Sequence, residues 1–134
     1  MNHIRPNEEA LSEPFWRNIQ AGRLTLQRCA HCKQYRHPPT PICANCLSFD
    51  DEWVEASGRG MIYTFTVVHH SVHPALDAKV PYVVALVELE EGVRIVSNLA
   101  LDEGVEPRIG MKVQCRIEPL ALDFRIPVFR CDEP

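Results

Sequence analysis

The sequence lacks the long apolar runs and the targeting patterns that would place it in a membrane or outside the cell. No stretch approaches the roughly 20 apolar residues of a membrane-spanning helix, and the first residues, Met1 to Pro6, contain no apolar core of a secretory signal. Six cysteines without an export signal are typical of a reducing compartment, where closely spaced cysteines bind metals. We therefore expect a cytoplasmic protein with no membrane segment.

The sequence also has few features of an independent enzyme or of a nucleic-acid-binding protein. It contains no glycine-rich phosphate loop, and no serine or cysteine stands at a recognisable spacing from a catalytic partner. Its net charge is −4, whereas a nucleic-acid-binding domain is usually clearly basic. The composition therefore argues against nucleic acid as a partner, and we name no catalytic residue.

Two CxxC pairs dominate the first half of the chain: Cys29-Ala-His-Cys32 and, after a spacer of ten residues, Cys43-Ala-Asn-Cys46. Each pair can form a tight turn that aims two sulfurs at one point, and four converging thiolates suit the tetrahedral site of structural zinc. The spacer holds three prolines, so it is a stiff loop and not the helix of a zinc finger. We predict a zinc ribbon with one structural zinc per chain. Two disulfides, four unconnected thiols and a site that holds iron are the alternatives.

A short amphipathic helix is predicted before the cysteines. Ser12 suits its N-cap and Gly22 its end. Phe15, Trp16 and Ile19 recur at helical spacing, so they form one apolar face. This face covers either the core of the chain itself, which is the default interpretation, or a partner.

Basic residues are concentrated in the segment from Arg17 to Arg36, although the chain as a whole is acidic. No acidic residue interrupts the segment, and four acidic residues follow at positions 50–55. The segment is either an ordinary solvated surface or a patch that faces phosphates or an acidic partner. Its members are Arg17, Arg23, Arg28, Lys33 and Arg36.

The rest of the chain alternates apolar and polar residues with the period of β-strands. Five strands are predicted, at residues 61–70, 82–90, 93–99, 111–118 and 126–131. In the second of these, the apolar residues from Val83 to Leu89 share one face, and Glu91-Gly92 makes a hairpin turn. The loop 101–110 is long enough for one helical turn. Five short strands suit a small closed barrel, for which the OB-fold is the best match; an SH3-like barrel and a small sandwich are the alternatives.

Helix, ribbon and barrel in this order resemble a known family that pairs an N-terminal rubredoxin-like zinc ribbon with a C-terminal OB-fold. That family was long catalogued as a domain of unknown function, and its members occur beside thiolases and other acyl-CoA enzymes. Two positions depart from its pattern, because Lys33 stands where many members have glycine and Thr40 where arginine is common. The matching segments are Phe15-Trp16 to Leu24, Arg28 to Cys32, Pro38 to Cys46, Gly60 to Thr66, Pro81 to Gly92, Gly110 to Val113 and Pro127 to Phe129.

The resemblance implies an accessory, non-catalytic subunit in lipid metabolism. Such a subunit would bind a thiolase-like, aldolase or hydratase enzyme and help to hold or channel acyl-CoA. We hypothesise that Phe15, Trp16 and the five basic residues form the acyl-CoA or partner surface. The expected division is a helical segment at 1–24, the zinc ribbon at 25–56 and the OB-fold at 57–134. A single-stranded nucleic-acid-binding OB-fold protein is one alternative, and a stand-alone enzyme that uses the loop from His69 to Lys79 is another.

Overall fold

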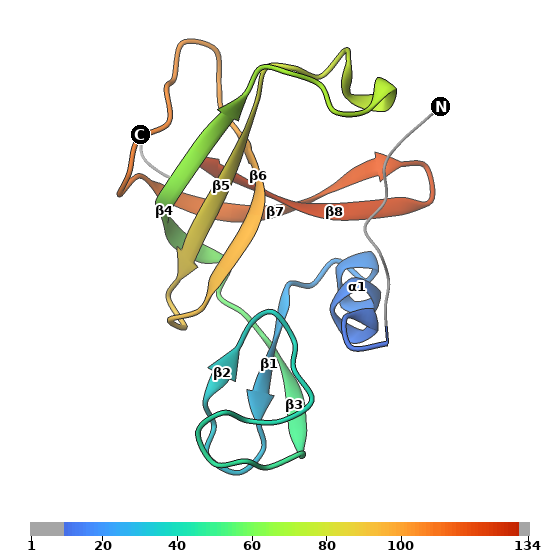
Figure 1. The fold of residues 1–134 in the computed structure, drawn as a ribbon, viewed down its shortest axis with the longest axis vertical. Helices are drawn as coiled ribbons and strands as arrows, with labels where there is room; N and C mark the ends of the chain where they lie inside the picture. The colour runs from blue at the N-terminus through green and yellow to red at the C-terminus, as the bar shows by residue number, and fades with distance from the viewer. Residues whose placement is uncertain (1–9, 132–134) are drawn as a thin grey trace.

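The computed structural model describes residues 10–131, which form a small β-ribbon and a closed β-barrel beside a single α-helix (Figure 1). The ribbon sheet has the strand order β2-β1-β3, and the barrel has the order β4-β5-β6-β8-β7. This barrel order is that of a five-stranded Greek-key OB-fold, so the predicted fold class is confirmed. The elements are α1 (Glu13–Gln20), β1 (Thr25–Cys29), β2 (Tyr35–Arg36), β3 (Asp51–Glu55), β4 (Arg59–Val68), the 3₁₀ turn η1 (Pro74–Leu76), β5 (Tyr82–Leu89), β6 (Arg94–Ala100), β7 (Lys112–Ala121) and β8 (Phe124–Cys131).

Helix α1 begins and ends where the sequence predicts. Ser12 occupies the N-cap position, although its side chain makes no capping hydrogen bond. At the other end, Gly22 adopts a φ of 84°, which glycine reaches without steric cost. The N–H of Gly22 donates to the carbonyl of Ile19 and the N–H of Arg23 to the carbonyl of Asn18, both at 2.9 Å. This pair of bonds is a Schellman termination, and it turns the chain directly into β1.

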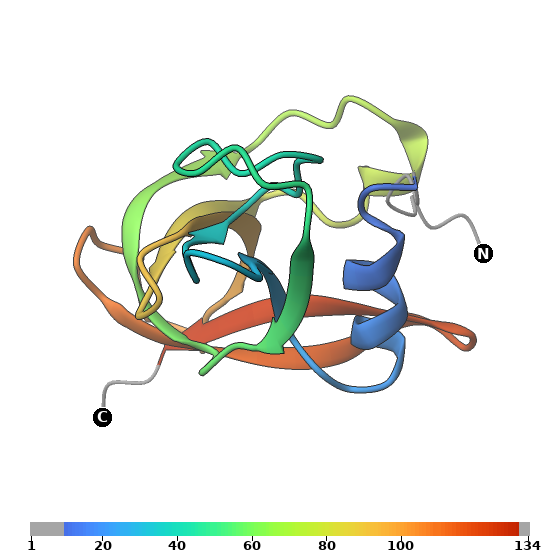
Figure 2. The same ribbon diagram turned by 90° about the horizontal axis from the view of Figure 1, so that it is seen from below.

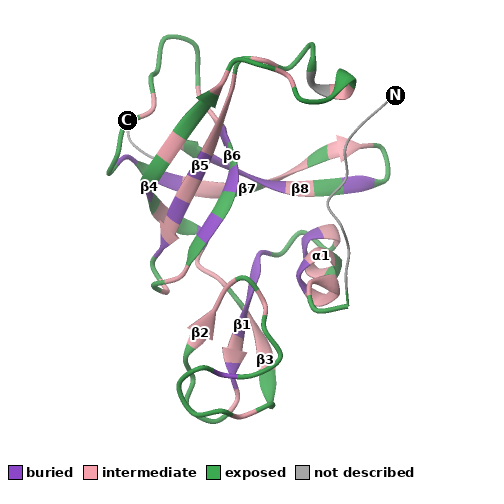
Figure 3. Ribbon diagram, viewed as in Figure 1, coloured by how far each residue is buried: buried purple, intermediate pink, exposed green. Residues whose placement is uncertain are grey.

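One hydrophobic core runs from α1 through the start of β1 into the barrel (Figure 3). Phe15 and Ile19 are buried in this core together with Leu24 and Leu26, so the helix covers the core of the chain itself. Trp16, in contrast, is only half-buried. The helix is also fastened to β8 by hydrogen bonds, and it lies beside the β7–β8 hairpin (Figure 2).

Strand β5 has the two faces that the sequence predicts. Val87 is fully buried and Leu89 is 2% exposed, whereas Glu88 between them is half-exposed. β5 pairs antiparallel with β4 and with β6, which places it in the middle of one wall of the barrel. A shift of one residue in this register would turn the apolar side chains out to water.

Three elements differ from the sequence prediction. Strands β2 and β3 were not predicted, since β2 has two residues and three of the five residues of β3 are acidic. Pairing with β1 along its whole length, from Thr25 opposite Glu55 to Cys29 opposite Asp51, overrides that weak strand propensity. The helical turn lies at η1, between β4 and β5, and not in the loop 101–110. In the described part of the chain, none of the helices has the length and apolar character that crossing a bilayer requires.

Candidate functional site

The first CxxC pair lies in a tight turn at the far end of β1, which we call the first knuckle. The N–H of Cys29 donates to the carbonyl of Gln34 (2.9 Å), and the N–H of Lys33 donates back to the carbonyl of Cys29 (3.1 Å). Inside the turn, the N–H groups of His31 and Cys32 donate to Cys29 Sγ at 3.4 and 3.5 Å. Donors of this kind favour the thiolate, and the N–H of Cys32 is the main cause of the lowered pKa of Cys29.

The second CxxC pair lies in an equivalent turn, the second knuckle. The N–H of Cys43 donates to the carbonyl of Ser48 (2.9 Å), and the N–H of Leu47 donates back to Cys43 (2.8 Å). Lys33 and Leu47 occupy the same position in the two knuckles, and their φ values are 66° and 64°. Glycine is the residue that adopts this left-handed conformation without steric cost. The glycine common at the Lys33 position in the family that the sequence resembles therefore has a physical reason.

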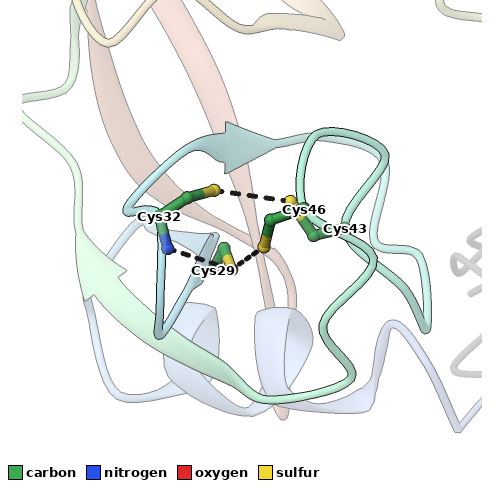
Figure 4. A group of neighbouring side chains, drawn as sticks. All are labelled: Cys29, Cys32, Cys43 and Cys46. Carbon is green, nitrogen blue, oxygen red and sulfur yellow. Dashed lines mark hydrogen bonds between the residues drawn. The ribbon is translucent and has the colours of Figure 1, made fainter.

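The two knuckles face each other and bring four sulfur atoms together (Figure 4). All four lie within 4.8 Å of one another, with Cys29 Sγ 3.4 Å from Cys46 Sγ and Cys32 Sγ 3.6 Å from Cys43 Sγ. A disulfide bond would require about 2.05 Å, and all four thiols are free. The structure therefore contains neither disulfides nor dispersed thiols at these positions.

The four sulfurs fit a tetrahedral metal ion. Four zinc–sulfur bonds of about 2.3 Å place the sulfurs about 3.8 Å apart, and the separations in the structure, from 3.4 Å to at most 4.8 Å, bracket that value. Cys29 and Cys43 are buried, while the other two thiols reach the surface. Within residues 10–131, no other group of three or more histidine, cysteine or acidic side chains has this convergence.

The thiols of the site differ in their pKa values. Hydrogen bonds from the side chain of Asn45 and from the N–H of Gln34 lower the pKa of Cys32 to about 6. The N–H of Ser48 lowers the pKa of Cys46, but the neighbouring thiols, Cys29 first, together with desolvation outweigh this effect and raise it to about 11. Four sulfurs at this spacing therefore share protons until a cation compensates their charge.

Gln27, which the sequence analysis did not single out, fastens the proline-rich spacer to β1. Its buried side-chain amide donates to the carbonyl of Thr40 (2.8 Å) and to the carboxylate of Asp51, and it accepts from the N–H of Thr40 (2.9 Å). Arg36 donates to the same carbonyl through Nε and Nη2. The sequence contains no clear signal for this role, because other residues of the same strand are also polar; the role follows from burial, since a buried amide has to find hydrogen-bond partners.

Acidic residues of β3 compensate part of the predicted basic patch. Arg28 Nε lies 2.7 Å and Lys33 Nζ 3.2 Å from the same carboxylate, that of Glu52. Arg28 first, and then Lys33, hold the pKa of Glu52 below its usual range. The acidic residues after the second CxxC pair thus compensate Arg28 and Lys33, because β3 lies antiparallel to β1.

The other three basic residues have different surroundings. Arg17 forms an exposed ion pair with Glu13, one helical turn away, at 3.1 Å. The side chain of Arg36 is 12% exposed and lies 3.9 Å from Asp51. Arg23 donates to the neutral side-chain oxygen of Asn18 at 3.2 Å and forms no ion pair with any described residue.

Phe15 and Trp16 do not share one surface. Their rings are perpendicular, with centroids 5.0 Å apart. Phe15 is buried, whereas the ring of Trp16 lies at the helix surface, 6.0 Å from the ring of Phe124. Of the seven residues predicted for the acyl-CoA or partner surface, Phe15 is therefore a core residue, and Trp16, Arg17 and Arg23 are among those available for contact.

The loop from His69 to Lys79 does not assemble a catalytic cluster. His69 and His70 are exposed. His73 serves the loop itself, since its Nδ1 accepts from the N–H of Ala75 (3.0 Å) and its carbonyl accepts from Ser71 Oγ (2.6 Å). These contacts cap the turn η1 and leave no nucleophile–base pair among the described residues of the loop.

Two family models match successive parts of the chain. A family model described as "ChsH2, rubredoxin-like zinc ribbon domain" matches residues 16–52, and one described as "ChsH2, C-terminal OB-fold domain" matches residues 53–118. The chain is 50% identical over 120 residues to a "Probable enoyl-CoA hydratase alpha subunit" of Thermomonospora curvata. That match covers 87% of this chain and 36% of the relative, so the chain spans about a third of the relative's length.

Two further matches extend over most of both proteins. The chain is 35% identical over 102 residues to a "DUF35 domain-containing scaffold protein" of Methanocaldococcus jannaschii, covering 74% of this chain and 71% of the relative. The solved structure "Ltp2-ChsH2(DUF35) aldolase" includes a chain that is 43% identical, with a TM-score of 0.88. That match covers 96% of this chain and 100% of the other.

Proposed function

Because this chain belongs to the ChsH2 (DUF35) family of zinc-ribbon and OB-fold proteins, we propose that it is an accessory, non-catalytic subunit of an acyl-CoA enzyme. Its partner would be a thiolase-like, aldolase or hydratase enzyme, and its task would be to help hold or channel acyl-CoA. The observation that carries the proposal is the match at a TM-score of 0.88 to a ChsH2 (DUF35) chain in a structure named as an aldolase. The "hydratase alpha subunit" name of the Thermomonospora relative supports the same class of partner.

We propose further that the four thiolates of Cys29, Cys32, Cys43 and Cys46 hold one zinc ion. Four sulfur ligands complete a tetrahedral shell, so zinc bound there supplies folding energy and leaves no open position for substrate. Iron also accepts four sulfurs in this geometry, and metal analysis separates the two. In this proposal the ribbon is residues 25–56, the OB-fold is residues 57–134 and the helical segment is residues 1–24.

Exposed apolar side chains support a role in association. Leu47 and Phe49, close together in and after the second knuckle, are 68% and 74% exposed, and Leu122 at the tip of the β7–β8 hairpin is fully exposed. A single exposed apolar residue is ordinary, whereas exposed apolar side chains that gather in one patch mark interaction sites. The ribbon is therefore the part of the chain that we propose for contact with the partner enzyme.

For the acyl-CoA phosphates, the pattern of ion pairs favours Arg23. Its guanidinium is bonded to a neutral oxygen, whereas Arg28 and Lys33 share the charge of Glu52. A phosphate is attracted most strongly by a cation whose charge no carboxylate already compensates. Arg23 is therefore the basic residue of the five that we propose for phosphate contact.

Co-expression with a thiolase-like, aldolase or hydratase enzyme tests the proposal. The chain should co-elute with one of these enzymes in gel filtration, and the complex should use acyl-CoA. Reversing the charge of Arg23 (Arg23→Glu) should raise the KM for acyl-CoA and leave thermal unfolding unchanged. Arg116→Glu is the matched control, because Arg116 is exposed on β7 and does not belong to the predicted surface. A chain that elutes alone beside all three enzyme classes would contradict the accessory role.

The two other functions gain no specific support. An OB-fold that binds single-stranded nucleic acid needs open aromatic faces on which bases stack. The guanidinium of Arg94 lies 3.7 Å from the centroid of the Tyr63 ring and covers that face. A stand-alone enzyme would need a reacting group in the loop from His69 to Lys79. Nδ1 of His73 in this loop already accepts a hydrogen bond from the loop backbone.

A further inference from the structure

A groove of about 440 Å³ lies where the barrel wall opens between β6 and β8. The two strands pair in parallel only from Asn98 to Ala100 on β6, opposite residues 128–130 of β8. Before Asn98 the two strands are not paired with each other, and Pro127 has no N–H with which to continue the pairing. Ser97 Oγ instead donates to the carbonyl of Pro127 (3.1 Å), which fixes the two strands at the floor of the opening.

The groove has apolar walls and a single charged residue. Trp16 of α1, Val83 of β5, and Leu120 and Ile126 of the β7–β8 hairpin line it from three sides. Lys79, just before β5, is the one charged residue among the described residues that line it, and it forms no ion pair within the described part of the chain. A volume of this size lies in the range of about 300–1,000 Å³ that is usual for small-molecule sites.

Three polar side-chain groups in the lining have no intramolecular partner. They are the indole N–H of Trp16, the hydroxyl of Tyr82 and the amide of Asn98, none of which forms a hydrogen bond within residues 10–131. They come from α1, β5 and β6, so they surround the groove instead of forming one patch. An apolar groove with a few converging polar groups is the usual composition of a ligand site.

We propose that this groove binds the phosphopantetheine arm of a CoA thioester. This arm alternates methylene and dimethyl groups with two amides and ends in a phosphate. The apolar segments would lie along Trp16 and Leu120, the amides would meet Tyr82 and Asn98, and the phosphate would meet Lys79. A simple fatty acyl chain would leave the polar groups of the groove without partners, which costs binding energy.

The inference rests on the proposed acyl-CoA function. The groove proposal can nevertheless be wrong while the accessory function is right. The groove is formed entirely by this chain, so binding is expected without any partner enzyme. Of the sequence-derived surface the groove uses Trp16. Its cation is Lys79, which would meet the phosphate of the arm, so Arg23 is left for the phosphates at the nucleotide end of CoA.

Fluorescence of Trp16 provides the measurement. The chain has two tryptophans, so a Trp53→Phe variant reports on Trp16 alone. Titration with phosphopantetheine should change its emission, and pantetheine without the phosphate should bind about tenfold more weakly, a difference of about 1.4 kcal/mol. Lys79→Gln should remove that difference and leave pantetheine binding unchanged. Arg116→Gln, a charge loss outside the groove, should preserve it.

A blocking variant tests the location independently. Asn98 is exposed on β6, so Asn98→Phe can fill the groove without disturbing the core, and Thr66→Phe places the same side chain on β4 outside it. Asn98→Phe should abolish binding of both pantetheine compounds, and Thr66→Phe should not. Absence of phosphopantetheine binding to the folded Trp53→Phe chain would overturn the proposal. Tighter binding of octanoate than of pantetheine, or equal effects of the two phenylalanine variants, would also overturn it.

Discussion

At the scale of single residues, four cysteine sulfurs converge at one point, and the carboxylate of Glu52 compensates two of the nearby cations. The CxxC spacing predicts convergence of the four cysteines, because two short turns suffice to bring each pair together. The pairing of Arg28 and Lys33 with Glu52 was not predictable in the same way. It depends on β3 lying antiparallel to β1, and the acidic sequence of β3 gives a weak strand signal. A basic segment therefore keeps its charge for binding only where the neighbouring strand carries no acidic side chains that form ion pairs with it.

Leu47 tests the backbone strain of the knuckles. The side chain of Leu47 is 68% exposed, so its removal costs little contact. The φ of Leu47 is 64°, so replacement by glycine should relieve backbone strain. Leu47→Gly should stabilise the metal-loaded chain by about 1 kcal/mol. Leu47→Ala keeps the Cβ atom and should give no such gain. Thermal unfolding of the three proteins measures the effect, and a lower melting temperature for the glycine variant would show that the turn is not strained.

Glu90 gives a prediction for pH dependence. The guanidinium of Arg59 holds the pKa of Glu90 below its usual value. A carboxyl whose pKa is lowered by folding stabilises the protein above its unfolded pKa of about 4.3, and this contribution is lost as the pH falls through the folded value. Glu90→Gln should therefore be less stable than the wild type at neutral pH, and the difference should disappear in acid.

Urea unfolding at several pH values measures this difference. In an Arg59→Gln background, Glu90→Gln should show a smaller pH-dependent difference, because the cation that lowers the pKa has been removed. A gap between wild type and Glu90→Gln that is equal at all pH values would assign the effect to packing and not to the ion pair.

Among the elements, β1 links the two halves of the chain. Its first residues, with Leu26 fully buried, belong to the core shared with the barrel, and its last residue, Cys29, belongs to the sulfur site. The sequence predicts the five barrel strands from their alternation of apolar and polar residues. It does not predict β2 and β3, whose formation depends on pairing with β1 and on the hydrogen bonds of Gln27 to the spacer.

Removal of one sulfur should destabilise the ribbon end of β1 and leave the barrel end folded. Cys43→Ser should release the metal, because one of the four sulfur ligands is lost. The ribbon should then loosen, since apparent zinc-binding energies of about 10–16 kcal/mol stabilise such small modules. The knuckles should then exchange amide hydrogens rapidly, while amides of the barrel strands stay protected by their own core. Elemental analysis combined with hydrogen exchange measures both parts. Full metal content in the serine variant, or none in the reduced wild type, would contradict the proposed site.

Strand β5 allows a test of the barrel core. Val87→Ala and Leu89→Ala should each destabilise the protein by about 2–4 kcal/mol, through lost burial and the cavity left behind. Glu88→Ala, on the opposite face of the same strand, should cost much less, since its side chain is half-exposed. Equal denaturation midpoints for the three variants would mean that the register of β5 is different.

At the scale of the whole molecule, ribbon, helix and barrel share one core and present their binding features on the outside. Composition and periodicity were sufficient to predict the barrel, since its strands alternate and follow one another along the chain. They were not sufficient for the groove between β6 and β8, which joins residues from α1, β5, β6 and the β7–β8 hairpin. The proposed subunit would thus hold a CoA arm in the barrel and contact its partner enzyme through the ribbon.

The central claim, an accessory subunit of an acyl-CoA enzyme, is tested most directly by native mass spectrometry. The chain would be tagged and purified from the cells that naturally produce it, without an added partner. The account predicts a complex that contains this 15.3 kDa chain, one zinc ion per copy and a second protein that turns over acyl-CoA. Recovery of the zinc-loaded chain by itself, at the mass of the monomer or of a homo-oligomer, would contradict the account.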